Sequence, residues 1–342
     1  MRALLVGFGS VGRKLAEILS DVPSHPGLAG LDVSVVAITT GSHGALANAS
    51  GLDLAAALAA TRDLGAFTAA HPDFAVLDAP AAIRSVECDV VVELSPLSVA
   101  GRGEPAISHV RTALLRGRHV ITANKGPLAW AYGELTALAT EAGRALLHEA
   151  TVMDGAPVFN LARRCLRGNT ILRIDGVFNS TTNVVLCEME RGARLDAAVA
   201  AAQRLGVAEA DPSDDLEGWD AAVKLAALAN ALMGGTLLPD QVERESVRSV
   251  TRERMDHARA DGCRVKMVCE LFREGGMVRG TVSARDLPDT DPFARVEGTA
   301  SLVRFSTDLL GTLLIAEEAP DVATTAYGVI SDLFALHDGS WR

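Results

Sequence analysis

The sequence predicts an α/β protein with two domains, one built on a Rossmann-like sheet and one of the α+β class. Three observations lead to this prediction. The chain has 342 residues, more than one ordinary hydrophobic core accommodates. Its first part alternates short apolar runs with amphipathic segments, and a later part holds an almost wholly apolar helix among strand-like segments. We expect the first domain at residues 1–130 and 316–342 and the second at residues 131–315.

Composition excludes several classes of protein. Hydrophobic residues make up 49% and charged residues 22%, which is typical of a globular rather than a disordered chain. Acidic residues outnumber basic ones by 43 to 32, and the net charge of -11 argues against a nucleic-acid partner. No apolar run reaches the roughly 18 residues of a membrane helix, and the five scattered cysteines form no metal or disulfide pattern. We therefore expect a cytoplasmic protein that acts on a small molecule.

The N-terminus carries a glycine-rich turn between a strand, Ala3–Val6, and an amphipathic helix, Val11–Leu19. The turn reads G-x-G-x-x-G, in which the glycines permit a tight bend, approach of a pyrophosphate and close helix–strand packing. The free N–H groups of the helix N-terminus then face the phosphates. The alternative is a tight turn without a ligand. The pattern predicts a Rossmann-like dinucleotide-binding domain whose cofactor contacts are Gly7, Gly9, Ser10, Val11 and Gly12.

The second predicted strand, Asp32–Thr39, bears on the choice of cofactor. NAD enzymes usually place an acidic residue at the end of this strand to bind the ribose 2′-OH. Here the strand is followed by Thr40-Gly41-Ser42-His43, whose hydroxyls and imidazole tolerate a 2′-phosphate better than a carboxylate would. We predict NADP, with Thr40 among its contacts, and keep NAD as the alternative because this loop has no arginine.

The remaining elements of the first domain continue the sheet. We predict a helical region at 44–80, a strand at Cys88–Leu94, a helix at His109–Leu115 and a strand beginning at His119. Ligands of open α/β sheets bind at the carboxyl ends of the strands. Ser95 and Lys125 stand at two such ends, so both are predicted to contact the cofactor.

Lysine is rare in this chain. Among the 32 basic residues only four are lysines: Lys14, Lys125, Lys224 and Lys266. Arginine cannot replace a lysine that must release a proton, because its pKa stays above about 12. We interpret Lys125 and Lys224 as functional and expect Lys14 and Lys266 to be ordinary surface residues. The alternatives are that Lys125 only neutralises a cofactor phosphate and that Lys224 is a core lysine held by Asp220.

Lys224 lies on the apolar helix, which runs from Ala221 to Met233 and is stopped by Gly234-Gly235. A buried lysine needs a partner or loses its proton. Asp220 stands four residues earlier, on the same face of the helix. This spacing predicts a site rather than a solvated acidic loop.

Six stretches of the chain, in sequence order, are similar to homoserine dehydrogenases. They are Val91–Pro96, Thr122–Ala129, His148–Val152, Gly176–Asn183, Leu205–Lys224 and Tyr327–Asp332. The resemblance covers nearly the whole chain. It implies an NAD(P)-dependent oxidoreductase that interconverts L-homoserine and L-aspartate 4-semialdehyde in threonine and methionine biosynthesis, in a short form without a C-terminal regulatory domain.

The resemblance also implies roles for individual residues. Lys125 and Lys224 line the substrate, one of them passes the hydroxyl proton, and Asp220 orients Lys224. The implied substrate contacts are Thr181, Glu209 and Asp215. A monovalent cation, Na+ or K+, is implied at backbone carbonyls of Glu149, Val152 and Asp154.

Three departures from the family pattern leave other functions open. They are the turn Met153–Pro157, the loop Glu317–Asp321, and Ser180 in place of a glycine. The alternatives are a dehydrogenase of the same scaffold for another small hydroxy compound, and a regulator that binds NADP without turnover.

The second domain is predicted to bind the substrate and to form a dimer. Its predicted strands are Ile171–Val177, Met277–Ser283 and Leu302–Thr307. An antiparallel sheet with one open face often becomes a subunit interface, so we expect a homodimer. The charged segment Gln241–Arg259 is predicted to be an exposed helix.

Overall fold

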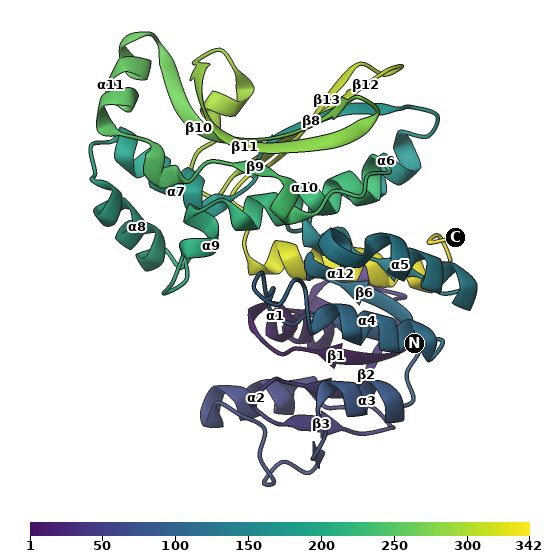
Figure 1. Ribbon diagram of the computed structural model, residues 1–342. Helices are drawn as coiled ribbons and strands as arrows, with labels where there is room; N and C mark the ends of the chain where they lie inside the picture. The colour runs from purple at the N-terminus through teal and green to yellow at the C-terminus, as the bar shows by residue number, and fades with distance from the viewer. The chain divides into compact units, whose positions relative to one another are not determined.

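The computed structural model describes residues 1–342, and the chain forms two compact units. The first comprises Met1–Pro127, Ala131–Pro157 and Asp321–Arg342, and the second Leu128–Trp130 and Val158–Pro320. One unit is built on a seven-stranded sheet and the other on a six-stranded sheet (Figure 1). The predicted α/β class, with a Rossmann-type sheet and a second sheet domain, is confirmed. No helix is long and apolar enough to cross a membrane.

The sheet of the first unit has the order β4-β3-β2-β1-β5-β6-β7. Its strands are β1 Arg2–Val6, β2 Ser34–Thr39, β3 Ala45–Ala47, β4 Phe74–Ala75, β5 Val90–Glu93, β6 His119–Thr122 and β7 Leu146–Leu147. Strands β2, β1, β5, β6 and β7 are parallel, and β3 and β4 add to the edge in antiparallel fashion. The parallel strands are buried on both faces, which explains why they read as continuous apolar runs.

Helices cover both faces of this sheet. The helices are α1 Ser10–Ser20, α2 Leu54–Leu64, α3 Ala79–Ser85, α4 Ala106–Leu115, α5 Gly126–Ala142 and α12 Val322–His337. One apolar cluster joins α1, α2 and α12 to the sheet, and a second joins α3, α4 and α5 to its other face. Short 3₁₀ turns lie at Val22–Ser24, Pro26–Leu28 and Glu149–Thr151.

The region 44–80 is less helical than predicted. It contains two short strands, β3 and β4, before and after α2. Asp53 begins α2 by accepting a hydrogen bond from Ala56 N, and Gly65 ends it in a left-handed conformation. Alanine favours a helix locally, but pairing of β3 with β2 overrides that preference.

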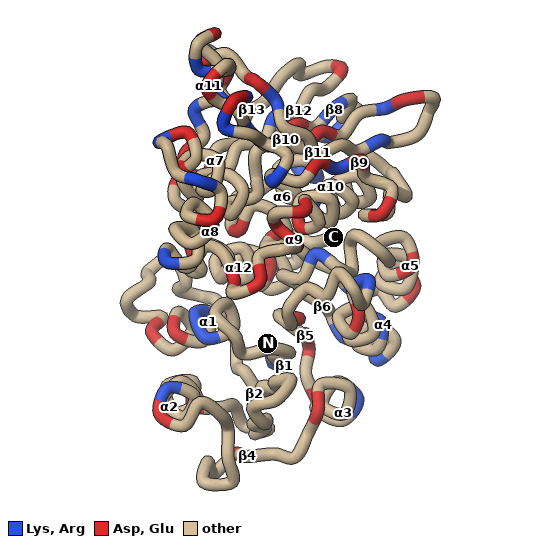
Figure 2. The backbone as a smooth tube through the Cα atoms, turned by 60° about the vertical axis from the view of Figure 1, so that its left-hand side comes forward, with Lys and Arg blue, Asp and Glu red and all other residues tan.

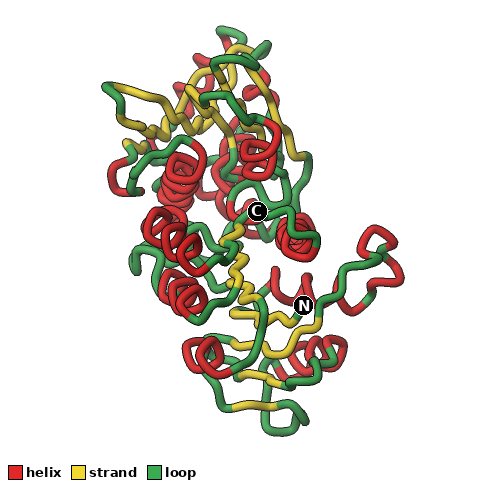
Figure 3. Tube along the Cα trace, turned by 90° about the vertical axis from the view of Figure 1, so that its right-hand side faces the viewer, coloured by secondary structure: helices red, strands yellow, loops and turns green.

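The sheet of the second unit has the order β13-β12-β8-β10-β11-β9. Its strands are β8 Ile171–Val177, β9 Glu243–Arg244, β10 Cys263–Glu274, β11 Met277–Pro288, β12 Ser301–Thr307 and β13 Thr312–Glu317. The pairs are antiparallel except that β9 runs parallel to β11. Its helices are α6 Val158–Cys165, α7 Ser180–Glu190, α8 Leu195–Arg204, α9 Ser213–Leu216, α10 Trp219–Leu232 and α11 Arg252–Ala260. Within this unit α7, α10 and α11 pack against β10 or β11. Figure 3 shows the helices in red and the strands in yellow.

The other face of this sheet carries charged side chains, and Figure 2 shows both signs of charge along its strands. Asp175 accepts hydrogen bonds from Arg173 Nε at 2.6 Å and Arg304 Nη2 at 2.9 Å. Glu270 pairs with Arg285 at 2.6 Å. One end of this face is covered by an apolar cluster that includes Phe293.

The predicted helix Gln241–Arg259 is wrong in its first half. The segment holds 3₁₀ turns at Pro239–Gln241 and Val247–Ser249 with β9 between them, and only α11 is an α-helix. Thr251 begins α11 by accepting a hydrogen bond from Arg254 N. Pairing of β9 with β11 takes the preceding residues out of the helix.

Candidate active site

The glycine-rich turn of the first unit forms a cradle in which Gly7 and Gly12 leave no room for a side chain. Gly7 has φ +108°, and a Cβ there would lie 2.6 Å from Leu94 O. A Cβ at Gly12 would lie 2.7 Å from Gly7 O, whereas one at Gly9 would meet nothing within 4 Å. The second glycine therefore faces open space beside the backbone. This is the geometry that a dinucleotide pyrophosphate requires.

Helix α1 begins directly after this turn. Its N-cap, Gly9, contributes no side-chain hydrogen bond, so the first N–H groups of α1, from Ser10 and Val11, have no capping partner. A helix N-terminus in this state favours an anionic ligand. The residues present therefore fit a dinucleotide.

A cavity of about 400 Å³ opens beside the turn. Gly7, Gly9 and Thr40 line it, together with Ser42, His43 and Arg13. The hydroxyl of Thr40 is engaged within its own loop, because it donates to Gly44 O at 2.8 Å and accepts from His43 N at 2.7 Å. Thr40 thus shapes the loop. Arg13 was not predicted from the sequence as a site residue. It brings a positive charge to this cavity, which the loop Thr40–His43 does not contain.

The carboxyl ends of β5 and β6 are joined by a buried carboxylate, that of Glu93, which is 0% exposed. Its Oε1 accepts hydrogen bonds from the N–H and the hydroxyl of Ser95, and lies 3.3 Å from His109 Nδ1. Its Oε2 accepts from Thr122 Oγ1 at 3.3 Å. Glu93 therefore fixes Ser95, one of the predicted cofactor contacts, against the end of the neighbouring strand.

Asn124 completes this junction. Its Nδ2 donates to Ser95 O at 2.9 Å, and its Oδ1 accepts from Gly126 N at 2.8 Å. Lys125 stands between them as the N-cap of α5. Glu93, His109 and Asn124 were missed from the sequence, although a charged residue at the end of an apolar strand was a signal for Glu93.

The turn that departs from the family pattern packs closely within the first unit. Met153 and Asp154 have φ +59° and +50°, a left-handed conformation that costs non-glycine residues about 1–2 kcal/mol each. The side chain of Asp154 accepts from Thr325 Oγ1 of α12 at 2.7 Å. Glu149 N donates to the buried Asp332 of the same helix at 2.9 Å. The segment predicted to bind a cation is thus held by α12.

Within the second unit, Asp220, Lys224 and Asp215 form one polar cluster. Lys224 Nζ lies 3.2 Å from Asp220 Oδ2 and donates to Phe178 O at 2.6 Å. Asn179 Nδ2 donates to Asp215 Oδ1 at 2.7 Å and to Asp220 Oδ2 at 3.0 Å. The two carboxylates are therefore bridged by one amide, a residue the sequence analysis did not name.

Thr181 joins the same cluster, because its hydroxyl donates to Asp215 Oδ2 at 2.8 Å. Burial raises the pKa of Asp215, and the nearby carboxylate of Asp220 adds to the effect.

Glu209 is not brought to this cluster. It is exposed, and no hydrogen bond or ion pair joins its side chain to Asp215, Asp220 or Lys224. Its backbone carbonyl accepts from Gln203 Nε2 at 3.1 Å. The acidic loop around it is the solvated part of the predicted cluster. No group of three or more His, Cys, Asp or Glu side chains could hold a metal ion.

Known proteins of one family match the chain along its whole length. Residues 7–149 match the family described as the NAD-binding domain of homoserine dehydrogenase, and residues 157–334 match the homoserine dehydrogenase family itself. A homoserine dehydrogenase of Methanocaldococcus jannaschii is 33% identical over 341 residues, covering 99% of both chains. The chain belongs to the homoserine dehydrogenase family.

Two further homoserine dehydrogenases bear on the cofactor. An NAD(+)-dependent homoserine dehydrogenase of Pseudomonas canavaninivorans is 34% identical over 342 residues, covering 99% of this chain and 96% of the relative. A hyperthermophilic archaeal homoserine dehydrogenase solved in complex with NADPH has a TM-score of 0.82 and 29% identity, covering 98% and 96% of the two chains. The resemblance seen in the sequence is confirmed, as is the class of enzyme, a nicotinamide-dependent oxidoreductase acting on homoserine.

One lysine of this chain lies in a place that differs from its prediction. Lys266 was predicted at the surface, but it is 1% exposed. The prediction was wrong because β10 is covered on both faces at this point. Residues 292–300 lie over the face that Lys266 shares with Val268. Lys14 is partly exposed and pairs with Glu17.

Proposed function

We propose that this chain oxidises L-homoserine to L-aspartate 4-semialdehyde, and catalyses the reverse reaction, with lysine-assisted proton transfer. The reaction would serve the threonine and methionine branch of biosynthesis in the cytoplasm. The observation that carries the proposal is the cluster of Asp215, Asp220 and Lys224, held together by Asn179 and Thr181.

The cluster offers a partner for two groups of the substrate, its ammonium and its hydroxyl. We assign the substrate ammonium to Asp215, whose carboxylate is half-buried and accepts from Thr181. Charge-assisted hydrogen bonds of this kind are among the strong ones. Glu209, being exposed, would act at most as an outer charge that attracts the ammonium.

The proton of the hydroxyl is assigned to a lysine. Lys224 is held by Asp220 and by Phe178 O, which fix the position of its ammonium. In the oxidation a neutral lysine amine accepts the hydroxyl proton, and in the reduction the ammonium returns it and stabilises alkoxide charge. A nicotinamide cofactor held at the turn Gly7–Gly12 would supply the hydride acceptor for the carbon that bears the hydroxyl. Lys125, at the carboxyl end of β6, is the second lysine that we assign to this step or to the cofactor.

An absorbance assay at 340 nm tests the proposal, with L-homoserine and either NADP or NAD at about pH 9, where a lysine more readily accepts a proton. We expect absorbance to grow with time. Lys224→Ala and Lys125→Ala should lose about 10²- to 10⁴-fold in rate. The matched control is Lys14→Ala, which removes a lysine from the surface. If absorbance at 340 nm rose as fast with Lys224→Ala and Lys125→Ala as with wild type, the proposed roles of the two lysines would be refuted.

We propose NADP as the preferred cofactor, with NAD as the alternative. The support is the meeting of Arg13, Ser42 and His43 around one cavity, because arginine binds phosphate strongly. Arg13→Ala should raise KM for NADP about tenfold and leave KM for NAD nearly unchanged. Equal effects on both cofactors would show that Arg13 does not read the 2′-phosphate.

We propose that the second unit forms a homodimer through the open face of its sheet. The support is the partly exposed network of Asp175 with Arg173 and Arg304, and the apolar Leu314, which is 44% exposed on the same face. Light scattering on a sizing column should give a dimer, and Leu314→Asp should give a monomer. A monomeric wild-type protein would refute the proposal.

A monovalent cation at the carbonyls of Glu149, Val152 and Asp154 is also proposed. Its support is the compact turn, held to α12 by Asp332 and Thr325. Activity should then be higher in Na+ or K+ than in tetramethylammonium at equal ionic strength. Equal activity in all three salts would refute the cation.

A further inference from the structure

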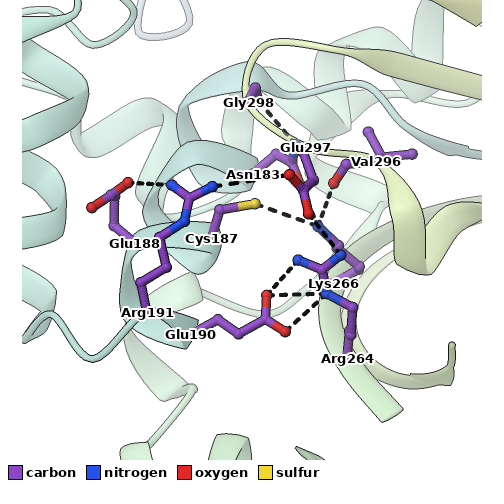
Figure 4. A network of polar contacts seen from close by, with 10 residues as sticks. All are labelled: Asn183, Cys187, Glu188, Glu190, Arg191, Arg264, Lys266, Val296, Glu297 and Gly298. Atoms are coloured by element: carbon purple, nitrogen blue, oxygen red, sulfur yellow. Dashed lines mark hydrogen bonds and ion pairs between the residues drawn. The ribbon is translucent and has the colours of Figure 1, made fainter. Parts of the chain in front are cut away.

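Lys266 is a buried lysine that the proposed reaction does not use. Its Nζ donates to Val296 O and to Asn183 Oδ1, the latter at 3.0 Å, and lies 3.6 Å from Cys187 Sγ (Figure 4). None of these partners is a carboxylate. Burial lowers the pKa of Lys266. An ammonium group kept out of water needs hydrogen-bond partners that offset its lost hydration, so the contacts to Val296 and Asn183 are what hold Lys266 in place.

The charged groups next to Lys266 do not neutralise it. Arg264 and Glu190 pair with each other, Nη2 to Oε2 at 2.6 Å, and Arg264 also reaches Glu297 at 3.0 Å (Figure 4). Lys266 therefore acts through its hydrogen bonds to neutral groups. Those bonds connect three separate parts of the second unit: β10, α7 and the loop after residue 295.

This loop is attached to α7 by three side chains. Lys266 binds Val296 O, and Asn183 Nδ2 donates to Gly298 O at 2.9 Å. Ser180 Oγ donates to Thr299 O at 3.3 Å. Asn183 is the centre of the arrangement, because its amide oxygen accepts from Lys266 while its amide nitrogen holds the loop.

The same turn of α7 carries the substrate residues. Asn179 caps α7 by accepting from Thr182 N at 2.8 Å and donates to Asp215 and Asp220. Thr181 donates to Asp215 at 2.8 Å. The first turn of α7 is thus fixed by Asp215 and Asp220 at its start and by Lys266 one turn later.

We propose that Lys266 is a positioning residue for homoserine: it fixes the first turn of α7, and so holds Asn179 and Thr181 in register with Asp215. This inference rests on the proposed role of Asp215 in binding the substrate ammonium. Lys266 touches neither substrate nor cofactor in this proposal. Its loss should therefore affect homoserine and leave the cofactor site of the other unit unaltered.

Steady-state kinetics of Lys266→Met separate these effects, because methionine has a similar length and no donor. Losing a hydrogen bond from a charged group should raise KM for homoserine about tenfold or more. KM for the cofactor should stay within about twofold, as for a remote substitution. Lys14→Met is the matched control and should change neither constant.

Asn183→Ala tests the same network with Lys266 in place. It provides the test of the proposal if Lys266→Met does not fold. It too should raise KM for homoserine alone. Unchanged KM for homoserine in a folded variant, or equal rises in both KM values, would overturn the proposal. Wild-type protein that fails to turn over homoserine would instead refute the proposed function, so the two failures are distinct.

Discussion

Replacing Glu93 with alanine should destabilise the first unit strongly. The carboxylate is fully buried and serves Ser95, Thr122 and His109 at once. A buried hydrogen-bonding group that loses its partner costs about 1–3 kcal/mol, and Glu93→Ala leaves several such groups without theirs. In a unit of this size such a loss lowers the melting temperature by on the order of 10 °C.

Thermal unfolding followed by circular dichroism, without cofactor, measures this effect. Glu134→Ala is the matched control, since Glu134 is an exposed carboxylate paired with Arg111. An exposed ion pair contributes about 0–1 kcal/mol, so the control should melt close to wild type. Glu93→Gln should fall between the two, because an amide keeps part of the hydrogen bonding.

A second measurement links this stability to the cofactor. Glu93 orients the hydroxyl of Ser95, so Glu93→Gln should raise KM for the cofactor while KM for homoserine changes less. If Glu93→Ala had the same melting temperature as Glu134→Ala, the buried carboxylate would not be the group that joins the ends of β5 and β6. The reasoning from its burial would then be wrong.

Three further predictions concern the cofactor cradle and the acid–lysine cluster. Because burial raises the pKa of Asp215, the folded state binds more protons than the unfolded state between the two pKa values, and stability falls as pH rises through that window. The melting temperature of Asp215→Asn should therefore rise relative to that of wild type as the pH is raised from about pH 4 to about pH 8. The same variant should have a KM for homoserine about tenfold higher than wild type. Gly7→Ala should lower the melting temperature because its Cβ meets backbone at 2.6 Å, whereas Gly9→Ala should fold and bind NADPH more weakly in a fluorescence titration. Lys224→Arg should lose turnover because arginine does not release a proton, and Lys14→Arg should keep full activity.

Some features of the site could be predicted because they depend on residues close in sequence. The glycine spacing defines the turn before α1, and the four-residue spacing of Asp220 and Lys224 puts both on one side of α10. Strand ends at Ser95 and Lys125 followed from apolar runs of the right length. The reaction was predicted from the family resemblance, which depends on the order of such patterns along the whole chain.

Other features were misjudged because local preference competes with distant pairing. The alanine-rich region 44–80 favours a helix, but β3 pairs with β2 there. In the charged segment before α11, Glu243–Arg244 form the short strand β9, which pairs with β11. Lys266 was expected in water, because a single lysine in a strand gives no sign of a loop that covers it.

The sequence by itself determined the fold class, the dinucleotide turn and the Asp–Lys pair, since each is set by spacing within one or two elements. Only the tertiary structure decided that Glu93 joins two strand ends and that Arg13 shares a cavity with the loop after β2. It also decided that Lys266 binds both Asn183 of α7 and Val296, which follows Lys266 by 30 residues. The physical reason is burial. The free energy of a charged side chain depends on which groups surround it after folding, and those groups come from distant parts of the chain.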